Sequence, residues 1–346
     1  MKASVVVRSK DEADRLRLTL ASLARQSAPA EVVVVNDGSS DHTDAVIEAA
    51  AAERRLTVVR HERPRGRSGA ANAGARAATG DILIFLDGDT LAGPEMVGAH
   101  LAAHAKRPGL VARGPMFHLR CTRFLKDPET GAPRDGEAAR IQRLPASDLA
   151  KLLVTRRQIA EDFAAIERRA ELGLYPGEGP RRLQALEMAA LTESPDCAVL
   201  WAAASGSNLS APRDAVLACG GFDERIELNE HRELALRLCE AGLRMVPAAA
   251  ARAYHLTHRS GWRDPLADQA WERLFWAKHP RPEVKLLAVF WASLGPTWPA
   301  APAARIHSLA ELEAAAREER DLDYDAVRRA LGLQALTPPL AAGAPA

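Results

Sequence analysis

A run of five apolar residues that ends at paired carboxylates constrains the fold of this chain most. Residues 82–86 read Ile-Leu-Ile-Phe-Leu, and Asp87, Gly88 and Asp89 follow. The run is too short for a helix and too continuous for a half-exposed strand, so it predicts a strand covered on both faces near the centre of a parallel sheet. Ligands of open α/β sheets bind outside the carboxyl ends of the strands, which puts Asp87 and Asp89 at the rim of a site.

The paired carboxylates favour a divalent cation. Asp87 and Asp89 repel each other at neutral pH, and a cation beside them relieves that repulsion. Mg²⁺ or Mn²⁺ is suitable, because hard divalent ions take oxygen ligands and Mg²⁺ is typically bound by one or two carboxylates plus substrate phosphates. Gly88 permits a backbone conformation or a close ligand approach that a side chain would obstruct. An acidic turn after a strand has the same composition and is the alternative.

Strand and helix patterns alternate through the first third of the chain. Short apolar strands are predicted at residues 4–7, 31–35 and 56–60, with helices between them and a small-residue helix before residue 80. Ser68 is the predicted N-cap of that last helix and Gly80 its stop. The alternation predicts an α/β fold with a doubly wound parallel sheet. Neither GxGxxG nor GxxxxGK[ST] occurs, which disfavours a dinucleotide-dependent oxidoreductase and a P-loop protein.

Composition indicates an ordinary soluble globular protein. The 346 residues are 47% hydrophobic and 26% charged, and a net charge of +1 gives no indication of nucleic-acid binding. The four cysteines form no CxxC pair, which predicts reduced thiols and a cytoplasmic protein without a zinc site. No secretory signal is visible at the start. The apolar run 286–292 is too short to span a bilayer, so it predicts a buried helix, with peripheral contact to the inner face of a membrane as the alternative.

Three motifs in order carry a resemblance to a known family. Residues 34–41 read Val-Val-Asn-Asp-Gly-Ser-Ser-Asp, residues 67–80 form the small-residue segment, and residues 85–89 read Phe-Leu-Asp-Gly-Asp. Together they resemble the nucleotide-sugar half of a family 2 glycosyltransferase with the GT-A fold. The resemblance implies a Rossmann-like, mostly parallel sheet flanked by helices. It also implies metal-dependent transfer of a sugar from a nucleoside diphosphate sugar, UDP-sugar favoured, to an acceptor hydroxyl with inversion.

The resemblance implies the residues of the donor site as well. The family's Asp-x-Asp motif matches Asp87, implied to lie near the ribose and the metal, and Asp89, implied to coordinate the ion that bridges the diphosphate. Asp37 of the Asn-Asp-Gly-Ser turn is implied to contact the nucleobase region. The complete predicted donor-binding set is Arg8, Glu12, Asp37, Arg67, Asp87, Gly88 and Asn208.

The exit of the first strand departs from the family pattern. The family usually reads Pro-x-Tyr-Asn or similar there, whereas residues 8–12 read Arg-Ser-Lys-Asp-Glu. Arg8 and Glu12 are therefore candidates for the nucleotide pocket, with surface charge as the alternative. The identity of the donor base stays open.

The residue expected to act as general base lies where the sequence departs a second time from the family pattern. The family usually has Glu-Asp-x-Glu-Leu after a Gly-Gly-Phe-Asp-Glu segment, and its Asp deprotonates the acceptor hydroxyl. Residues 230–234 of this chain read Glu-His-Arg-Glu-Leu. A carboxylate and a neutral imidazole can both accept the proton, so Glu230 and His231 are equal candidates. If neither serves, the chain is inactive or activated in another way.

A histidine after the next predicted strand is expected to supply a third metal ligand. Related enzymes often place one there, and Mn²⁺ accepts imidazole nitrogen readily. His258 is the first choice and His255 the second, with a structural histidine as the alternative. Three residues that follow are candidates to close over the diphosphate and sugar: Arg259, Trp262 and Arg263.

Four regions are predicted along the chain. They are a nucleotide-sugar-binding half (1–113), a helical insertion that forms an acceptor region or lid (114–196), an acceptor and catalytic half (197–264), and a helical C-terminal extension with a flexible tail (265–346). Expected partners are the donor and a hydroxyl-bearing saccharide, small molecule or peptide, with the tail available for a homo-oligomer. A noncatalytic nucleotide-sugar-binding protein is the alternative function. A sugar nucleotidyltransferase ranks lower, because the first strand lacks a Gly-rich loop.

Overall fold

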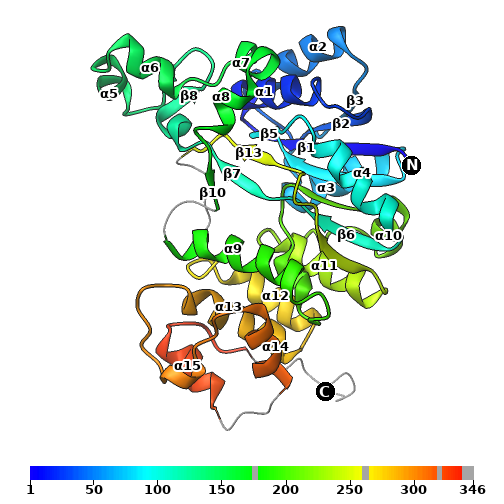
Figure 1. Ribbon diagram of the computed structural model, residues 1–346, viewed down its shortest axis with the longest axis vertical. Coiled ribbons are helices and arrows are strands. Elements are labelled where there is room, and N and C mark those ends of the chain that lie inside the picture. The colour runs from blue at the N-terminus through cyan, green and yellow to red at the C-terminus, as the bar shows by residue number, and fades with distance from the viewer. Residues whose placement is uncertain (174–177, 259–264, 318–321, 337–346) are drawn as a thin grey trace.

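A seven-stranded sheet is the central element of the fold (Figure 1). The computed structural model describes residues 1–173, 178–258, 265–317 and 322–336. Neighbouring strands are parallel except β11, which runs antiparallel to both β4 and β6. The predicted mostly parallel sheet is therefore confirmed. In spatial order the strands are β12 (Arg244–Pro247), β6 (Leu110–Arg113), β11 (Leu209–Pro212), β4 (Ile82–Asp87), β1 (Ala3–Ser9), β2 (Ala30–Asn36) and β3 (Thr57–Arg60).

Strand β4 lies in the middle of this sheet, as its apolar run predicts. The five apolar residues 82–86 are all buried, with exposures of 0–4%. The register places Asp87 of β4 opposite Arg8 of β1, and Ser9 of β1 opposite Asn36 of β2. The carboxyl ends of these three strands therefore meet at one edge of the sheet, where the site lies.

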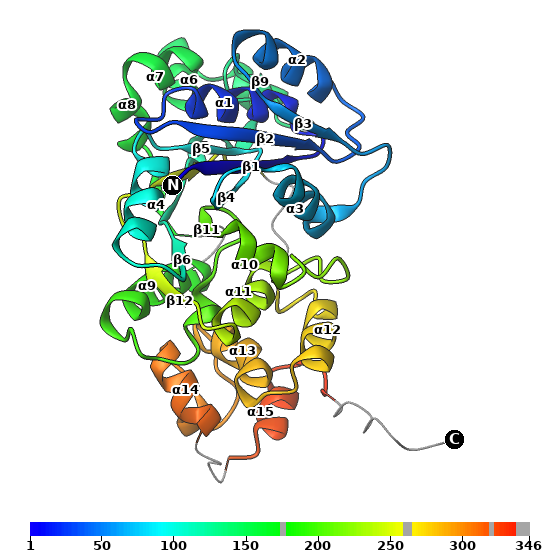
Figure 2. The same cartoon turned by 90° about the vertical axis from the view of Figure 1, so that its right-hand side faces the viewer.

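Alternate residues of the strands divide the core into two layers. Val5 and Val7 of β1 face α1, α2 and α4, whereas Val6 faces α3, α10 and α11. This period of two is the geometry of a strand buried on both faces. Figure 2 shows α1 and α2 along one side of the strands and α3 on the other. The helix bounds are α1 (Ala13–Leu23), α2 (Thr43–Glu53), α3 (Gly66–Ala77), α4 (Met96–Lys106), α10 (Arg213–Ala218) and α11 (Glu230–Glu240).

Two sequence predictions about α3 were wrong. The helix begins at Gly66 and ends at Ala77, so Ser68 lies inside it and Gly80 lies beyond its end. The Ser68 hydroxyl instead donates to the carbonyl oxygen of Ile226 at 2.9 Å. Gly80 packs against β1, where an added Cβ would lie 2.6–2.8 Å from atoms of Ser4 and its neighbour. Tertiary contacts, not helix capping, explain both residues.

A smaller four-stranded sheet lies beside the carboxyl end of β4. Its strands, in spatial order, are β10 (Glu171–Leu172), β7 (Met116–His118), β13 (Ala253–His255) and β5 (Thr90–Ala92). The pairing sets His255 opposite both His118 and Thr90. This sheet therefore brings two histidines to the end of the Asp-Gly-Asp segment. A separate hairpin pairs β8 (Leu125–Asp127) with β9 (Ala132–Pro133).

The helices of residues 114–196 divide into two groups. Helices α5 to α8 lie on the α1 side of the molecule, whereas α9 packs against η2, α13 and α14 near the other end (Figure 1). The segment 114–196, predicted as one acceptor region or lid, therefore contributes helices to two separate places in the fold. The bounds are η1 (Arg120–Phe124), α5 (Ala138–Gln142), α6 (Ala146–Leu152), α7 (Arg156–Glu161), α8 (Phe163–Glu167), α9 (Glu178–Glu193) and η2 (Leu200–Ala203).

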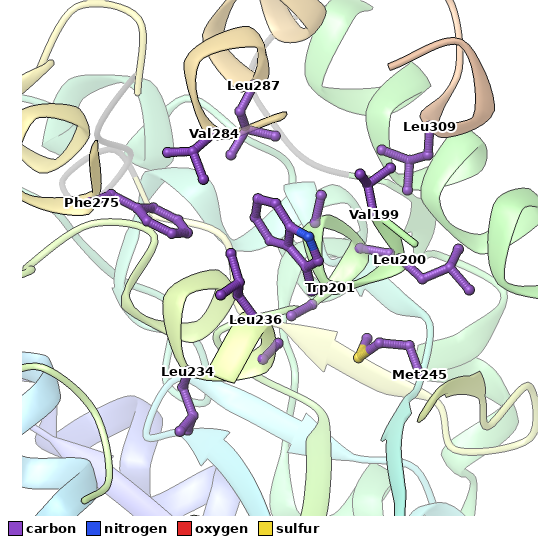
Figure 3. Packing of buried hydrophobic residues seen from close by; sticks show 14 of the residues in the cluster. Val199, Leu200, Trp201, Leu234, Leu236, Met245, Phe275, Val284, Leu287 and Leu309 are labelled. Atoms are coloured by element: carbon purple, nitrogen blue, oxygen red, sulfur yellow. The ribbon is translucent and has the colours of Figure 1, made fainter. Parts of the chain in front are cut away.

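The C-terminal helices form a second layer under the sheet. The apolar run 286–292 lies in α13 and is a largely buried helix, as predicted. Figure 3 shows Val284 and Leu287 of α13 and Phe275 of α12 around Trp201. Within the described residues no helix is long and apolar enough to cross a bilayer. The bounds are α12 (Ala270–Lys278), α13 (Pro282–Ser293), η3 (Pro302–Ala304), α14 (Leu309–Arg317) and α15 (Tyr324–Ala330).

Two buried histidines of α4 form hydrogen bonds with side chains at the start of β11. His100 Nε2 lies 2.8 Å from Asn208 Oδ1, and the Ser210 hydroxyl lies 2.8 Å from His100 Nδ1 and 2.9 Å from His104 Nε2. Burial lowers the pKa of both imidazoles to about 4. Both rings are therefore neutral in the folded protein at pH 5, whereas they are mostly protonated in the unfolded chain.

We predict that acid destabilises the protein through these rings. The unfolded state binds more protons than the folded state between pH 6.5 and 4, so the free energy of unfolding falls as pH falls. For His100 the loss between pH 7 and 5 is about 1 to 2 kcal/mol. Urea denaturation at both pH values measures it. His100→Gln should reduce the pH dependence, because it removes one of the two buried rings.

Candidate functional site

A cavity of about 730 Å³ opens at the carboxyl ends of β1, β2 and β4. It gathers motifs that are far apart in the sequence. Gly88 and Asn208 do not line it. The predicted site residues that do line it are Arg8, Glu12, Asp37, Arg67, Asp87, Asp89, Glu230, His231, His255 and His258.

Arg8 lies at the centre of the cavity wall and joins the two halves of the site. Its Nε donates to Asp87 Oδ1 at 2.7 Å, and its Nη1 donates to Glu230 Oε1 at 3.1 Å. Burial lowers the pKa of Arg8, but the two carboxylates outweigh burial and raise the pKa above its ordinary value. Arg8 is therefore a permanent cation that pairs with two carboxylates in the cavity wall.

Glu12 and Gly88 lie together beneath the paired aspartates. Burial, followed by the charges of Asp89 and Asp87, raises the pKa of Glu12 well above its ordinary value. A Cβ at Gly88 would lie 2.5 Å from Glu12 Oε1 and 2.8 Å from Ser9 Oγ. The glycine is thus required by the close approach of these side chains, and it presents no surface to the cavity.

Asp37 fixes the start of α3 at the edge of the cavity. Its carboxylate accepts hydrogen bonds from the backbone N–H groups of Arg65 at 2.8 Å and Gly66 at 3.0 Å, and it lies 2.7 Å from His61 Nδ1. This carboxylate, and not Ser68, satisfies the first amides of the helix. Arg67 is exposed at the rim, and its carbonyl oxygen accepts from Arg8 at 3.3 Å.

Asn208, predicted to bind the donor, supports the floor of the site instead. It is fully buried, its Nδ2 donates to the carbonyl oxygens of Pro115 and Ala251, and its Oδ1 lies against His100. All of its hydrogen-bonding capacity is used by the scaffold. Its backbone has φ of 64°, a left-handed conformation that asparagine tolerates better than most residues. The sequence prediction overlooked how deeply this segment is buried.

Asp89, His255 and His258 form a cluster that can hold a metal ion. One ligand atom from each lies within 4.8 Å of the others, and Asp89 Oδ2 is 3.2 Å from His255 Nε2 and 2.9 Å from His258 Nε2. Burial raises the pKa of Asp89, but the two histidines hold it well below its ordinary value. An ionised carboxylate with two imidazoles suits Mn²⁺ better than Mg²⁺, which prefers oxygen ligands. Asp87 faces Arg8 and lies outside this cluster.

His118 adjoins the cluster and was missed by the sequence analysis. It is buried on β7, and its Nδ1 lies 3.2 Å from His255 Nδ1. Only one of these two nitrogens carries a proton. If that proton is on His255, the lone pair of His255 Nε2 faces Asp89 and is free for an ion, which is the arrangement expected of a residue that orients a metal ligand. No local motif marks His118, because only strand pairing brings it to His255.

Glu230 and His231 begin α11 on the opposite wall. Burial raises the pKa of Glu230, but His231, Arg8 and Arg67 hold it far below its ordinary value, so the carboxylate is ionised. Burial lowers the pKa of His231, so its ring is neutral at pH 7. Arg232 Nη1 lies 2.9 Å from His231 Nε2. Because a guanidinium only donates, this contact occupies the Nε2 lone pair and assigns the ring proton to Nδ1.

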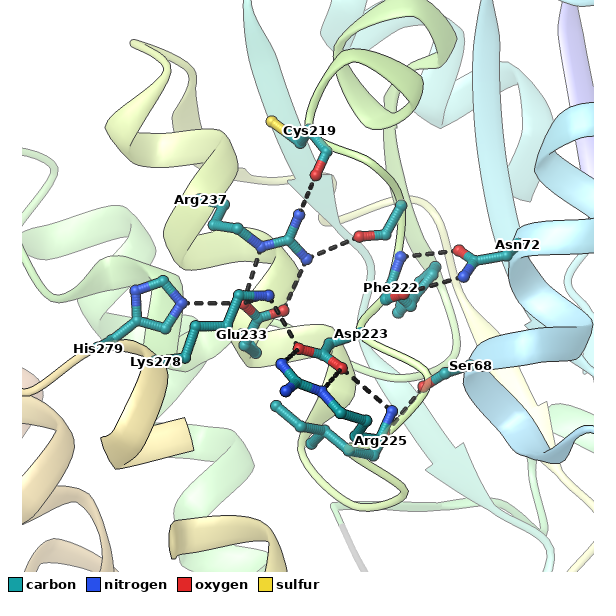
Figure 4. A network of polar contacts seen from close by, with 12 residues as sticks. Ser68, Asn72, Cys219, Phe222, Asp223, Arg225, Glu233, Arg237, Lys278 and His279 are labelled. Atoms are coloured by element: carbon teal, nitrogen blue, oxygen red, sulfur yellow. Dashed lines mark hydrogen bonds and ion pairs between the residues drawn. The ribbon is translucent and has the colours of Figure 1, made fainter. Parts of the chain in front are cut away.

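A polar network behind α11 fixes its position, as Figure 4 shows. The buried carboxylate of Glu233 accepts from Arg237 at 2.6 and 2.8 Å and contacts Lys278 at 2.8 Å and His279 at 2.9 Å. The network joins α11 to α12. Glu233 is therefore a structural residue that holds Glu230 and His231 in place.

The far wall of the cavity comes from residues that no motif marked. Strand β6, the start of α11 and helices α9 and α13 converge there. The sequence separates these elements widely, so only the packing of α9 and α13 under the sheet reveals the wall. Arg259, Trp262 and Arg263, predicted to close over the donor, lie outside the described residues. The residues of the far wall that the sequence analysis missed are Arg113, Gln184, Glu187, Asn229, Arg232 and Trp291.

Residues 4–162 match the sequence model described as "Glycosyl transferase family 2". The match covers just under half of the chain, and over it the chain is similar to glycosyl transferase family 2. The chain is 34% identical over 155 residues to the "Uncharacterized glycosyltransferase YfnE" of Bacillus subtilis (strain 168), a match that covers 44% of this chain and 39% of that protein. It is 38% identical over 160 residues to "Validoxylamine A glucosyltransferase" of Streptomyces hygroscopicus subsp. jinggangensis (strain 5008), covering 41% and 37%. The chain thus spans well under half the length of these curated relatives.

Solved structures share the GT-A fold with this chain. S. aureus TarS 1-349 in complex with UDP gives a TM-score of 0.52 at 16% identity, covering 85% of this chain and 69% of that one. The mannosyltransferase PcManGT from Pyrobaculum calidifontis, in complex with GDP-Man and Mn²⁺, gives 0.50 at 16% identity, covering 96% and 73%. At these identities the likeness establishes the fold, and the predicted GT-A architecture is confirmed.

We predict that removing the Arg8 charge destabilises the fold. Arg8→Leu leaves the buried carboxylate of Glu230 without its cation, at a cost of about 3 to 5 kcal/mol. Thermal unfolding at pH 7 measures the effect. The control is Arg157→Leu, which breaks an exposed helical ion pair with Glu161 and should leave Tm unchanged. Equal Tm values for the two variants would show that Arg8 does not hold the site together.

Proposed function

We propose that this family 2 glycosyltransferase moves a sugar from a nucleoside diphosphate sugar to an acceptor hydroxyl, with inversion, and that it uses a divalent ion. The cluster of Asp89, His255 and His258 in the same cavity as Arg8 and Glu230 carries the proposal. It supplies an ion site at the carboxyl end of β4 and an ionised carboxylate on the facing wall. Those are the two parts that a direct displacement at a sugar carbon needs.

The proposed donor site lies along the β1, β2 and β4 edge. When bound, the ion supplies positive charge that stabilises the departing diphosphate. Arg67 and Lys10, which also line the cavity, add cations on the same side. A UDP-sugar is the proposed donor. The solved neighbours are described with UDP, UDP-GlcNAc and GDP-Man, which supports a nucleoside diphosphate sugar as the donor class.

Glu230 is the proposed general base. Its carboxylate is ionised, and Arg8 occupies only one of its oxygen atoms, whereas Oε2 lies 3.5 Å from the proton-bearing Nδ1 of His231. The neutral His231 ring has no free lone pair, because Arg232 occupies Nε2. His231 is therefore proposed to orient Glu230 and the acceptor through its Nδ1–H group. The low pKa of Glu230 weakens it as a base, and the displacement depends more on charge stabilisation at the leaving group.

The first experiment is calorimetric titration with UDP-, GDP- and dTDP-sugars, each with Mn²⁺ and with chelator. One donor should bind only with Mn²⁺. Asp89→Asn should weaken that binding at least tenfold, because it removes the charged ligand of the proposed ion site. Asp214→Asn, at a side chain that is 99% exposed, is the control. Equal binding with Mn²⁺ and with chelator would contradict the proposed metal dependence.

The base is tested by comparing Glu230→Gln with His231→Gln at saturating donor. We expect Glu230→Gln to lower kcat by about 10²- to 10⁴-fold, the usual contribution of a general base, and His231→Gln to have the smaller effect. Donor calorimetry on both variants checks that the site is intact. The reverse order would assign the base to His231. Donor binding without transfer or hydrolysis by the unmodified protein would favour the noncatalytic alternative.

A further inference from the structure

Several buried polar atoms without hydrogen-bond partners lie on the far wall of the cavity. In the part of the chain that the structure describes, four buried side-chain atoms of this wall have neither a hydrogen bond nor an ion-pair contact of their own: Arg113 Nε, Gln184 Oε1, Asn229 Nδ2 and Trp291 Nε1. These residues are only 0–7% exposed. Buried polar atoms are nearly always paired in native proteins, so four orphans at one wall require an explanation. A ligand that pairs with them is the simplest.

We call this wall the polar chamber, lined by Arg113, Gln184, Glu187, Asn229, Arg232 and Trp291. Helix α9 supplies Gln184 and Glu187, the start of α11 supplies Asn229 and Arg232, and α13 supplies Trp291. Figure 1 shows that α9, α11 and α13 lie below the sheet. The chamber is therefore built by the helices outside the nucleotide half.

The chamber is held rigid by groups other than its orphan atoms. Glu187 lies 2.6 Å from Arg113 Nη1 and 2.7 Å from Arg232 Nη2, and the Arg232 guanidinium lies 5.0 Å from the centre of the Trp291 indole ring. Gln184 Nε2 donates to the carbonyl oxygen of Met116 at 2.8 Å. Asn229 Oδ1 accepts from Arg232 at 2.7 Å. The orphan atoms are thus fixed before any ligand arrives, which reduces the entropic cost of binding.

A continuous series of contacts connects the chamber to the proposed base. Glu187 contacts Arg232, Arg232 lies 2.9 Å from His231, and Glu230 lies 3.5 Å from His231 and 3.1 Å from Arg8. Glu230 and His231 therefore lie between the chamber and the Arg8–Asp87 pair of the proposed donor side. The acceptor must approach the base from the side away from the leaving diphosphate, which is the chamber side.

The orphan atoms define the chemistry of the ligand. Arg113, Asn229 and Trp291 each offer an N–H donor, whereas Gln184 offers a carbonyl acceptor. A hydroxyl both donates and accepts, so one ring that carries several hydroxyls can satisfy all four, whereas an alkyl chain can satisfy none. Glu187 lies between Arg113 and Arg232, and Arg8 lies between Asp87 and Glu230. These three cations and three carboxylates balance, so the ligand need not be charged.

We infer that the polar chamber is the acceptor site and that it takes a neutral, hydroxyl-rich ring, a saccharide or a cyclitol. This inference rests on the proposed function, because it uses Glu230 as the base.

The test measures acceptor binding directly and apart from donor binding. Saturation-transfer NMR is recorded with methyl glucoside, methyl galactoside, N-acetylglucosamine and myo-inositol, with UDP and Mn²⁺ present. At least one of these four compounds should show saturation transfer from the unmodified protein. Trp291→Phe removes one N–H and keeps the aromatic ring, and Asn229→Asp exchanges the free donor for an acceptor while keeping the contact to Arg232. Each should weaken that ligand at least fivefold. Trp298 lies outside the cavity, and its indole N–H donates a hydrogen bond to the carbonyl oxygen of Ala301. The control Trp298→Phe should therefore have no effect.

Donor calorimetry on the same variants separates the two proposals. Unchanged donor affinity in Trp291→Phe and Asn229→Asp, with weakened ring binding, supports the chamber as the acceptor site. Weakened donor affinity with unchanged ring binding overturns it and assigns the chamber to the transferred sugar. If the donor binds but none of the four rings shows saturation transfer, the chamber is not the acceptor site. The proposed function then still stands. Ring binding without any donor binding overturns the proposed function instead.

Discussion

The interaction on which the rest of this site depends is the buried guanidinium of Arg8 between Asp87 and Glu230. The contact joins the first strand to a helix 222 positions later in the chain. Buried carboxylates are costly without a cation and tolerable with one, so the ends of β1 and β4 and the start of α11 must face one another. A single cation at the end of β1 therefore fixes the distance between the end of β4 and the start of α11.

The cavity that results has two chemically different walls. On one side the sheet ends place Asp89 beside His255 and His258, which form the proposed ion site. On the other side α9, α11 and α13 present orphan hydrogen-bonding atoms that are fixed by ion pairs. Glu230 and His231 lie between the two. Under the proposed function, this arrangement separates charge stabilisation at the donor from recognition of the acceptor.

Much of the polar chemistry near the cavity serves the scaffold. Asp37 satisfies the first amides of α3, Asn208 ties β11 to two neighbouring segments, and Glu233 anchors α11 to α12. Asn208 and Asn229 also hold left-handed backbone conformations at the floor and at the start of α11. Such conformations persist where surrounding contacts determine them, and here they orient the segments that carry the site.

The sequence by itself determined the buried central strand, the parallel sheet and the position of the paired aspartates, because each is written in a local pattern of apolar and turn residues. Comparison with the family pattern, including its departure at residues 8–12, also proposed Arg8, Glu230, His255 and His258 as site residues, and all four line the cavity. Only the tertiary structure decided which of them touch: Asp87 turns to Arg8, and Asp89 joins the histidines. It also corrected Ser68, Gly80 and Asn208, and it revealed His118 and the polar chamber. Those features depend on strand pairing and helix packing between distant segments, and a local pattern carries no information about such contacts.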